Sequence, residues 1–517
     1  MDLDVFLQNI VSFINEVRGE NRQDVLRQLV EEIVIYQVQA KEHGDFYSSL
    51  EEALSEDIEL YYLVLFTIQF ISQDKECISI MDKLLMRSDL DVFVAGNICF
   101  QLASIRFRDF SLKRSYAQGR EINQFLLDKY EKEYPLPVPY LPYEERNKKR
   151  IAIETDTLLR LEHAPTRIVL DACQVLQKDL GYEVLLIVNA LGMKEERMKQ
   201  FCAFPYIPHR LPALDGAFSL EYEGTVIQGY QLPWEPGAIG EMQQSIMELY
   251  DWKPLCVWHI GGGSFRHDIL RNFTTVLSMP CVDGYSVSEA QVLVSYMQSN
   301  SQSVKEAVEY AEQHGQKCLN IESKTQRGEM GTGRKRSDFQ LPEDAFVITI
   351  VGNRLDDEMS KEFNQMLLEL EQQIDDIYFL IIGPCKRKPL QTRDKNKVKY
   401  VGFCKDLVDV VKLADLFVNP PRQGGGGGAV CALISDVPIV TLPDCDVFNM
   451  IGEEFSCRDM TEMKEVIIRY TQDDDFYKSQ QTKERQKKEE REQIDNKTSY
   501  REMLQTVETW LQKGEIT

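Results

Sequence analysis

Over the first 134 residues, apolar side chains recur every three or four positions. Two such stripes cover residues 5–14 and 25–33, and no proline occurs before Pro135. This spacing places the apolar side chains on one face of a helix. The pattern therefore predicts an all-helical N-terminal domain over residues 1–134.

A cluster of prolines ends this pattern, with four of them between Pro135 and Pro142. Proline lacks a backbone N–H and clashes with the preceding helical turn, so no helix continues through such a stretch. Residues 135–149 are therefore predicted to form a proline-rich linker between two domains.

Beyond the linker, short apolar runs alternate with amphipathic stretches. Strands that alternate with helices predict a parallel sheet with right-handed crossovers. We expect a first Rossmann-like domain over residues 150–313. Its predicted strands are 150–154, 182–188, 255–260 and 274–277, and its predicted helices are 166–179 and 288–298.

The same alternation returns later and predicts a second Rossmann-like domain over residues 314–478. Ligands of such sheets bind outside the carboxyl ends of the strands, so the loops after these strands should converge on one site. The predicted strands are 345–351, 377–382, 398–401 and 416–418, and the predicted helices are 357–374 and 405–413.

Residues 479–517 are predicted to form C-terminal helices. The first part, 479–495, consists mostly of Lys, Arg, Glu and Gln and is typical of a solvated helix. The final helix carries an apolar stripe that should pack back on the core. The stripe consists of Tyr500, Met503, Leu504, Val507, Trp510 and Leu511.

Five consecutive glycines, Gly424 to Gly428, separate the predicted strand 416–418 from an apolar stretch that is predicted to start a helix. A strand, a glycine turn and a helix start leave backbone N–H groups pointing at open space, with the positive end of the helix dipole behind them. This arrangement binds phosphate. The alternative is a flexible linker, but glycine linkers are usually long and rich in serine.

Composition narrows the class of protein. A formal net charge of -24 argues against a nucleic-acid surface or a polybasic membrane patch. The twelve cysteines show no metal-binding spacing, and no secretory signal pattern precedes them. The longest apolar run, residues 60–71, is too short to span a bilayer. We therefore expect a cytoplasmic protein without a transmembrane segment and without nucleic acid as a partner.

Several motifs together resemble the GT-B fold of nucleotide-sugar glycosyltransferases. They are Gly352-Asn353-Arg354 at a strand end, the loop from Pro420 to Gly426, and the terminal amphipathic helix. The resemblance covers about residues 150–512. It implies an α/β fold with two Rossmann-like domains facing a cleft, preceded here by the all-α domain. It also implies a nucleotide-sugar donor held by the second domain.

The sequence departs from this family at two positions. Retaining members carry a pair of glutamates across the loop and helix, the first near the transferred sugar and the second near the ribose. The matching residues here are Gln423 and Cys431. This departure supports a second hypothesis, in which the chain is a catalytically silent GT-B partner or chaperone subunit of a glycosylation complex.

On the donor side, Arg354 is the predicted catalytic residue of the second domain. A guanidinium at a strand end can clamp a diphosphate through two parallel hydrogen bonds and offset the charge of the leaving nucleotide. The alternative for Arg354 is a surface salt bridge to Asp356 or Asp357. The resemblance adds a set of donor-binding residues: Phe403 beside the base, and Gln423, Gly424, Gly425, Gly426, Gly427, Gly428 and Ala429 around the diphosphate.

On the acceptor side, His163 is the second predicted catalytic residue, because a neutral imidazole can take a proton from an acceptor hydroxyl. The alternative is a helix-start histidine bonded to backbone. Thr166 should cap the same helix and could also touch a substrate. Gly262 and Gly263 form either an acceptor-side loop or a plain turn. No Asp-x-Asp pair suits a metal-bound diphosphate, so we expect no metal and no other cofactor.

These features predict a glycosyltransferase that moves a sugar from a nucleoside diphosphate sugar to a polypeptide or glycan acceptor. UDP is the carrier that the resemblance favours. An all-helical domain before a GT-B core is also typical of protein-modifying transferases, so we expect either protein glycosylation or the modification of a polysaccharide precursor. The helical domain is a candidate site for a protein partner.

Overall fold

The computed structural model describes residue 8 and residues 46–108, 112, 114–161, 163–190, 210–232, 236–262, 265–296, 302–324, 333–443 and 445–516. Apart from residue 8, the two apolar stripes predicted at residues 5–14 and 25–33 lie outside this part of the chain. Among the described residues, no helix combines the length and the apolar character that crossing a bilayer requires.

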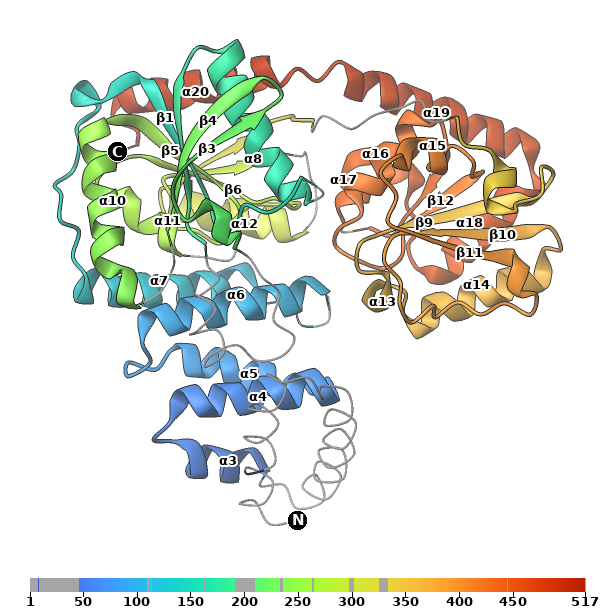
Figure 1. Cartoon of the computed structure of the whole chain (residues 1–517), viewed down its shortest axis with the longest axis horizontal. Coiled ribbons are helices and arrows are strands. Elements are labelled where there is room, and N and C mark those ends of the chain that lie inside the picture. The colour runs from blue at the N-terminus through green and yellow to red at the C-terminus, as the bar shows by residue number, and fades with distance from the viewer. Residues whose placement is uncertain are drawn as a thin grey trace.

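The described part of the N-terminal region is helical, as the spacing predicts (Figure 1). Its helices are α3 (Phe46–Leu54), α4 (Ile58–Ser72), α5 (Lys75–Leu85), α6 (Val92–Arg108) and α7 (Tyr116–Glu133). Polar side chains set their starts: Asp57 accepts from the N–H of Leu60, and Ser115 and Gln118 form a capping box. The apolar faces of these helices share one core.

The first Rossmann-like domain is built on an eight-stranded sheet in the order β3-β4-β2-β1-β5-β6-β7-β8. All neighbouring strands are parallel except β3 and β4, which form an antiparallel hairpin. The strands are β1 (Asn147–Thr155), β2 (Glu183–Val188), β3 (Gly216–Tyr222), β4 (Thr225–Gln231), β5 (Pro254–Ile260), β6 (Val276–Met279), β7 (Val292–Ser295) and β8 (Lys317–Asn320).

Helices cover both faces of this sheet. One face packs against α8 (Ala164–Gln174), which continues as the π-helical turn η3 (Val175–Asp179), and the other packs against α10 (Ile239–Trp252) and α12 (Gln302–Gln313). The short helix α11 (Arg266–Ile269) and the 3-10 turn η6 (Leu270–Asn272) follow β5. Two separate apolar cores therefore flank the sheet.

Two predictions for this domain are wrong. Residues 288–298 were expected to be a helix, but the short strand β7 occupies Val292–Ser295. Its residues are fully buried in a continuous apolar run, which is typical of a central parallel strand and looks like a buried helix in sequence. The domain also extends past residue 313, because β8 pairs with β7 and completes the first sheet.

The second Rossmann-like domain has a five-stranded parallel sheet in the order β11-β10-β9-β12-β13. The strands are β9 (Phe346–Val351), β10 (Ile377–Ile382), β11 (Val398–Gly402), β12 (Leu416–Val418) and β13 (Ile439–Val440). The helices are α13 (Leu355–Glu358), α14 (Lys361–Gln373), α15 (Leu407–Val411), α16 (Gly426–Ile434), α17 (Asp446–Ile451) and α18 (Met460–Gln472).

One predicted helix of this domain is divided. Residues 357–374 were expected to form a single helix, but α13 ends at Glu358 and α14 begins at Lys361. Ser360 interrupts the helix, because its backbone is extended and its hydroxyl accepts a hydrogen bond from the N–H of Phe363. The break leaves α13 as a separate short helix after β9.

The chain returns to the first domain at its C-terminal end (Figure 1). Helix α19 (Asp474–Glu492) lies on the second domain, and α20 (Asn496–Lys513) packs against the first sheet. Tyr500 of α20 contacts Trp258 of β5 edge to face, with ring centroids 5.0 Å apart. The apolar stripe of the last helix is thus buried in the core of the first Rossmann-like domain.

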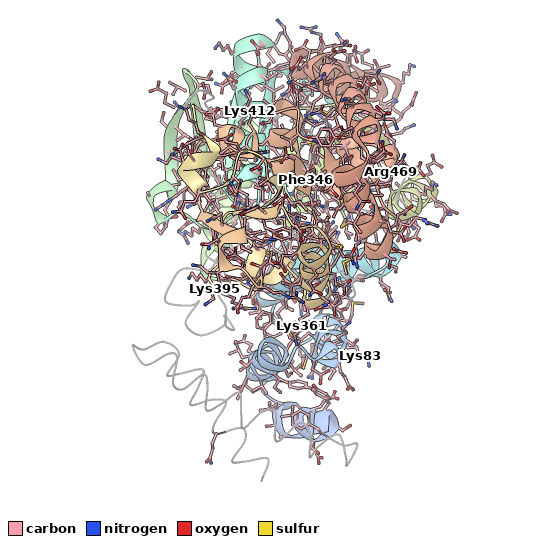
Figure 2. All side chains as sticks on the ribbon, turned by 90° about the vertical axis from the view of Figure 1, so that its right-hand side faces the viewer. Lys83, Phe346, Lys361, Lys395, Lys412 and Arg469 are labelled. Atoms are coloured by element: carbon pink, nitrogen blue, oxygen red, sulfur yellow. The ribbon has the colours of Figure 1, made fainter. Side chains whose placement is uncertain are left out.

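Short 3-10 turns complete the described secondary structure: η2 (Tyr143–Glu145), η4 (Pro212–Leu214), η5 (Pro236–Ala238), η7 (Arg336–Phe339), η8 (Lys395–Lys397) and η9 (Glu453–Phe455). Figure 2 looks onto the outer face of the second domain. The exposed basic side chains labelled there, Lys361, Lys395, Lys412 and Arg469, lie apart from one another over this face.

Candidate active site between the two Rossmann domains

The glycine run starts a helix instead of forming a loop throughout. Helix α16 begins at Gly426, so three of the five glycines are helical, and Gly425 before it has a left-handed φ of 109°. A Cβ on Gly425 would lie 2.4 Å from Oδ1 of Asn419. A Cβ on Gly428 would lie 3.0 Å from the side chains of Phe417 and Val351. Both positions therefore need glycine, one for the turn and one for close packing on the sheet.

Fewer backbone N–H groups are available to an anion at the start of α16 than the sequence predicts. The N–H groups of Gly428 and Ala429 both donate to the carbonyl of Gly425 and are used inside the helix. Ala429 is also fully buried. These two N–H groups are therefore not available to a ligand in this geometry, and donor binding by Gly428 and Ala429 stays a prediction. The N–H groups ahead of the first helical turn belong to Gly424–Gly426, of which Gly425 is partly exposed and Gly424 and Gly426 are buried.

Arg422 fixes the shape of this loop from inside. Its guanidinium donates to Oδ1 of Asn419 at 2.8 Å, to Oε2 of Glu358 at 2.6 Å and to the carbonyl of Val351 at 2.7 Å. The side chain is buried. No local pattern in the sequence predicts this role, although Arg422 lies shortly before the glycine run. It holds the loop, the end of β9 and helix α13 together.

Arg354 lies at the same loop and is partly open to solvent. Its Nη2 is 2.9 Å from Oε1 of Glu358, and 37% of its side chain is exposed. The salt bridge expected to Asp356 or Asp357 is not the one observed, since Asp356 accepts the backbone N–H groups of Lys386 and Arg387 instead. A Cβ on Gly424 would lie 3.5 Å from Nη2 of Arg354. The structure thus brings Arg354 to the start of the glycine loop.

Asp446 is a third ionisable residue at the glycine loop, and no local pattern in the sequence predicts a role for it. Its N–H donates to the carbonyl of Gln423 at 2.8 Å, and its carboxylate accepts the N–H of Asp283, from the first domain, at 3.0 Å. Burial raises the pKa of Asp446 to about 7, and the charge of Asp283 adds to the rise, whereas Arg422 and Arg354 oppose it. Asp446 therefore links the glycine loop to the first domain.

His163 approaches the same place from the first domain. It is the residue before α8, and its Nδ1 lies 3.1 Å from the hydroxyl of Thr166. Burial lowers the pKa of His163, and the positive charge of Arg354 lowers it further. The imidazole is therefore neutral at pH 7, and it lies close enough to Arg354 to sense its charge.

Thr166 does not cap the helix as predicted. The N-cap residue is His163, and the Thr166 hydroxyl accepts the N–H of Leu159 at 2.9 Å while it also bonds His163. Only 1% of Thr166 is exposed. Thr166 therefore holds the loop between β1 and α8 and orients His163.

The other predicted residues lie near the strand ends. Gly262 is exposed after β5, and Gly263 lies outside the described residues. Phe403, after β11, is 55% exposed. Cys431, at the position of the second family glutamate, is buried in the core around α16. Its thiol therefore does not face the space in front of the glycine loop.

Two stacked histidines, His259 and His267, pack beside the loop after β5. The rings of His259 and His267 stack with centroids 3.7 Å apart, and Nε2 of His259 lies 3.6 Å from Oδ2 of Asp156. Burial alone would lower the pKa of His259, but the carboxylate of Asp156 raises it above the usual value. Burial lowers the pKa of His267 well below its usual value, and the charge of His259 adds to this. Both rings are buried and brace the strand ends.

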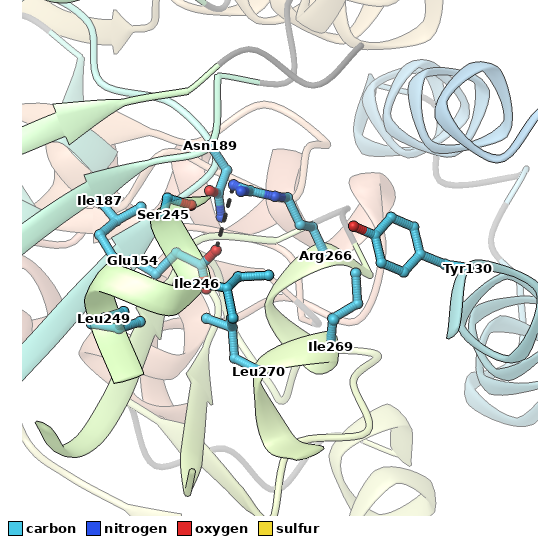
Figure 3. A pocket seen from close by; sticks show the side chains of 10 residues that line it. All are labelled: Tyr130, Glu154, Ile187, Asn189, Ser245, Ile246, Leu249, Arg266, Ile269 and Leu270. Atoms are coloured by element: carbon cyan, nitrogen blue, oxygen red, sulfur yellow. Dashed lines mark ion pairs between the residues drawn. The ribbon is translucent and has the colours of Figure 1, made fainter. Parts of the chain in front are cut away.

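A small pocket lies between the helical domain and the first sheet (Figure 3). Arg266 and Glu154 pair across it at 3.9 Å, Asn189 points into it from the end of β2, and Tyr130 reaches it from α7. Burial raises the pKa of Glu154 to about 7, although His259 and Arg266 oppose the rise. This pocket joins the helical domain to the first sheet and is separate from the glycine loop. In the part of the chain that the structure describes, no three His, Cys, Asp or Glu side chains gather as metal ligands.

Comparison with known proteins identifies the second domain. Residues 345–473 match the family model described as glycosyl transferases group 1. The chain is a glycosyltransferase. The matched segment contains Arg354, Arg422, the glycine loop and Asp446, so the residues that converge in space belong to the glycosyltransferase domain itself. None of the curated proteins compared matches the sequence.

A solved structure that aligns over nearly the whole chain supports the GT-B fold. A mutant of the O-GlcNAc transferase of Thermobaculum terrenum aligns with a TM-score of 0.54 and 13% identity, over 99% of this chain and 98% of that one. HepE of Anabaena, in complex with UDP and glucose, aligns with a TM-score of 0.45 and 13% identity, over 69% of this chain and 99% of that one. An α,α-trehalose-phosphate synthase of Burkholderia vietnamiensis has a TM-score of 0.45 and 9% identity, over 70% and 99%.

Proposed function

We propose that this glycosyltransferase moves a sugar from a UDP-sugar to a hydroxyl or amide of a polypeptide or glycan acceptor. The observation that carries the proposal is the position of Arg354 at Gly424, in front of the N-terminus of α16. A partly exposed guanidinium and a helix N-terminus together supply the positive potential that a diphosphate requires. UDP is the carrier because it is the commonest in the GT-B fold that the chain adopts.

In this proposal, Arg354 stabilises the leaving nucleoside diphosphate. The bond from the sugar to the diphosphate breaks, and negative charge collects on the phosphate oxygens. A preorganised cation at that point lowers the barrier more than it strengthens substrate binding. The exposed ring of Phe403 lies beside the base. No metal ion takes part, since the arginine and the helix N-terminus supply the positive charge.

His163 is assigned to the acceptor side. A neutral imidazole can accept a hydrogen bond from the acceptor hydroxyl and take its proton as the new glycosidic bond forms. The hydrogen bond to Thr166 orients the ring. Gly262, exposed at the end of β5, belongs to the acceptor-side surface in this proposal.

A polypeptide acceptor is favoured over a polysaccharide precursor by the helical domain, which reaches the donor loop through Phe107. The Thermobaculum structure is named an O-GlcNAc transferase, which agrees with a hydroxyl acceptor. We place the reaction in the cytoplasm. No disulfide joins the described cysteines, which agrees with a reducing compartment.

A second candidate function is a catalytically silent GT-B subunit that binds and stabilises a partner enzyme. Gln423 replaces one family glutamate, and the thiol of Cys431, which replaces the other, is buried in the core. These replacements remove two carboxylates without removing the diphosphate site. The second candidate therefore predicts nucleotide binding without turnover.

Release of nucleotide from sugar donors separates the two candidates. The purified full chain would be incubated with UDP-glucose, UDP-GlcNAc, GDP-mannose and ADP-glucose, and free nucleoside diphosphate would be measured over time, with Arg354→Ala as control. Slow hydrolysis of one donor by the wild type, lost in the variant, supports the enzyme. Tight binding of a donor with no release above the Arg354→Ala background supports the silent subunit.

A further inference from the structure

The helical N-terminal domain contributes a side chain to the donor loop. Phe107, at the C-terminal end of α6, lies under the guanidinium of Arg354, with Cζ of the arginine 4.5 Å from the ring centroid. A Cβ on Gly424 would lie 3.6 Å from Cζ of Phe107. In Figure 1, α6 ends on the side that faces the second Rossmann domain. The aromatic ring therefore touches both the predicted catalytic arginine and the glycine loop.

The end of α6 is fixed in this position by neighbouring contacts. Arg106, next to Phe107, bonds Asp82 of α5 at 2.5 Å and the carbonyl of Leu112 at 3.0 Å. Helix α7 in turn anchors the helical domain to the first Rossmann domain. Arg120 pairs with Glu289 at 2.6 Å. The ring of Phe107 is thus held by a framework that continues into the first Rossmann domain.

The contact restricts how Arg354 can move. Glu358 bonds one edge of the guanidinium, and the face of Phe107 covers one side of its plane. A cation over an aromatic ring gains about 0.5–2 kcal/mol, more where water is excluded. With one edge bonded and one face covered, the guanidinium has fewer orientations available, while 37% of the Arg354 side chain stays exposed to a ligand. Such preorganisation lowers the entropy that ligand binding would otherwise cost.

We infer that Phe107 is a donor-site positioning residue, which orients Arg354 toward the diphosphate of the sugar nucleotide. The inference rests on the proposed function, because it assumes that a nucleoside diphosphate binds at Arg354. It makes the helical domain part of the donor site, in addition to any partner that this domain binds. A shift of the helical domain relative to the second Rossmann domain would then change the affinity for the donor.

The test compares UDP binding by isothermal titration calorimetry among variants of the full chain. Phe107→Ala and Phe107→Leu remove the aromatic face, and Phe107→Tyr keeps it. We expect the first two to weaken UDP binding by about threefold to thirtyfold, the range that corresponds to the loss of a cation–π contact. Phe107→Tyr should bind within about twofold of the wild type. Phe100→Leu changes an aromatic residue of the same helix away from Arg354 and serves as the matched control.

A double-mutant cycle separates positioning from a general effect on folding. If Phe107 acts through Arg354, adding Phe107→Leu to Arg354→Ala should cause no further loss of affinity, whereas a purely structural effect would add to it. Thermal melts of each variant confirm that the fold is retained.

The possible results distinguish a failure of the Phe107 inference from a failure of the proposed function. If the wild type binds UDP but Phe107→Ala and Phe107→Leu bind it equally well or more tightly, the ring does not orient Arg354 for binding. This inference is then overturned, while the proposed function stands. If the wild type binds none of UDP, GDP and ADP, the proposed function fails, and the inference fails with it.

Discussion

Two arginines share the carboxylate of Glu358, and they differ in how many of their donors are used. Arg422 is buried and bonds Glu358, Asn419 and the carbonyl of Val351. Arg354 bonds the other oxygen of Glu358 and keeps 37% of its side chain exposed. Arg422 therefore acts in folding, and Arg354 has donors left for a ligand.

The first prediction concerns Arg422. Arg422→Met should lower the free energy of unfolding by about 3 kcal/mol, because it leaves buried hydrogen-bond acceptors on Glu358, Asn419 and Val351 without their donor. The control is Arg387→Met, whose side chain is 73% exposed and 3.8 Å from Asp357. It should change stability by less than about 0.5 kcal/mol. Urea denaturation followed by circular dichroism measures both. Equal stability of the two variants would show that the buried hydrogen bonds of Arg422 do not stabilise the fold.

Asp446 gives a prediction about pH. Its pKa is raised by burial to about 7 in the folded protein, whereas an unfolded aspartate titrates near pH 4. The folded state therefore binds a proton that the unfolded state has lost between these pH values. The stability that this proton contributes is fully present below about pH 4 and is lost as the pH rises through about 7.

Asp446→Asn removes this titration and keeps an oxygen that can accept the N–H of Asp283. Relative to the wild type, the variant should gain about 2–3 kcal/mol of unfolding free energy between pH 5 and pH 8. Urea unfolding of both proteins at the two pH values gives the difference. A difference that does not change with pH, or that falls as the pH rises, would show that the Asp446 carboxyl is not held in its neutral form.

At the residue scale, the sequence identifies groups that lie at strand ends and misses groups that depend on distant contacts. Arg354 was predicted from its position directly after β9. Arg422 pairs with a residue 64 positions away, and Asp446 accepts from one 163 positions away. Nothing local in the sequence marks such pairings.

Among the secondary-structure elements, the glycine run is the one on which the site depends. Its N-terminal glycines form the turn, and its C-terminal ones enter α16 and let the helix pack closely on β12 and β9. The site therefore depends on where the helix starts, because that residue determines which N–H groups face the cleft.

Gly425→Ala tests this dependence. The substitution forces a left-handed φ on alanine and places Cβ 2.4 Å from Oδ1 of Asn419. We expect a loss of about 1–3 kcal/mol in stability and a loss of UDP binding of at least about tenfold, because a shifted helix start moves the N–H groups. Gly240→Ala is the matched control, since nothing lies within 4 Å of its Cβ. Thermal melts and calorimetry report the two effects. Wild-type UDP affinity in Gly425→Ala would mean that the loop does not contact the diphosphate.

Buried strands that precede a glycine turn were predicted well from the sequence. The strands expected at 377–382 and 416–418 coincide with β10 and β12. The strand β7 was missed because three buried apolar residues and a serine carry no periodicity, and the break before α14 was missed because one serine sets it. The antiparallel pairing of β3 with β4 was also not predicted, since the alternation of strands and helices indicated parallel strands alone.

On the scale of the whole molecule, three parts of the chain meet at Arg354. Phe107 of the helical domain and Glu358 of the second Rossmann domain contact Arg354, and His163 of the first Rossmann domain lies close enough for the charge of Arg354 to lower its pKa. The sequence predicts the two Rossmann-like domains and the helical domain as separate units. It does not predict that the helical domain reaches the donor loop, because that contact depends on how the domains pack.

The central claim is that Arg354 and the glycine loop form a working donor site. Calorimetric titration of UDP into the full chain tests it most directly, with Arg354→Ala as the variant and Arg387→Ala as an exposed control. We predict that the wild type and Arg387→Ala bind UDP with equal affinity, and that Arg354→Ala binds at least about tenfold more weakly, as expected for the loss of a charge-assisted contact to phosphate. UDP affinity that is equal in all three proteins would contradict the claim.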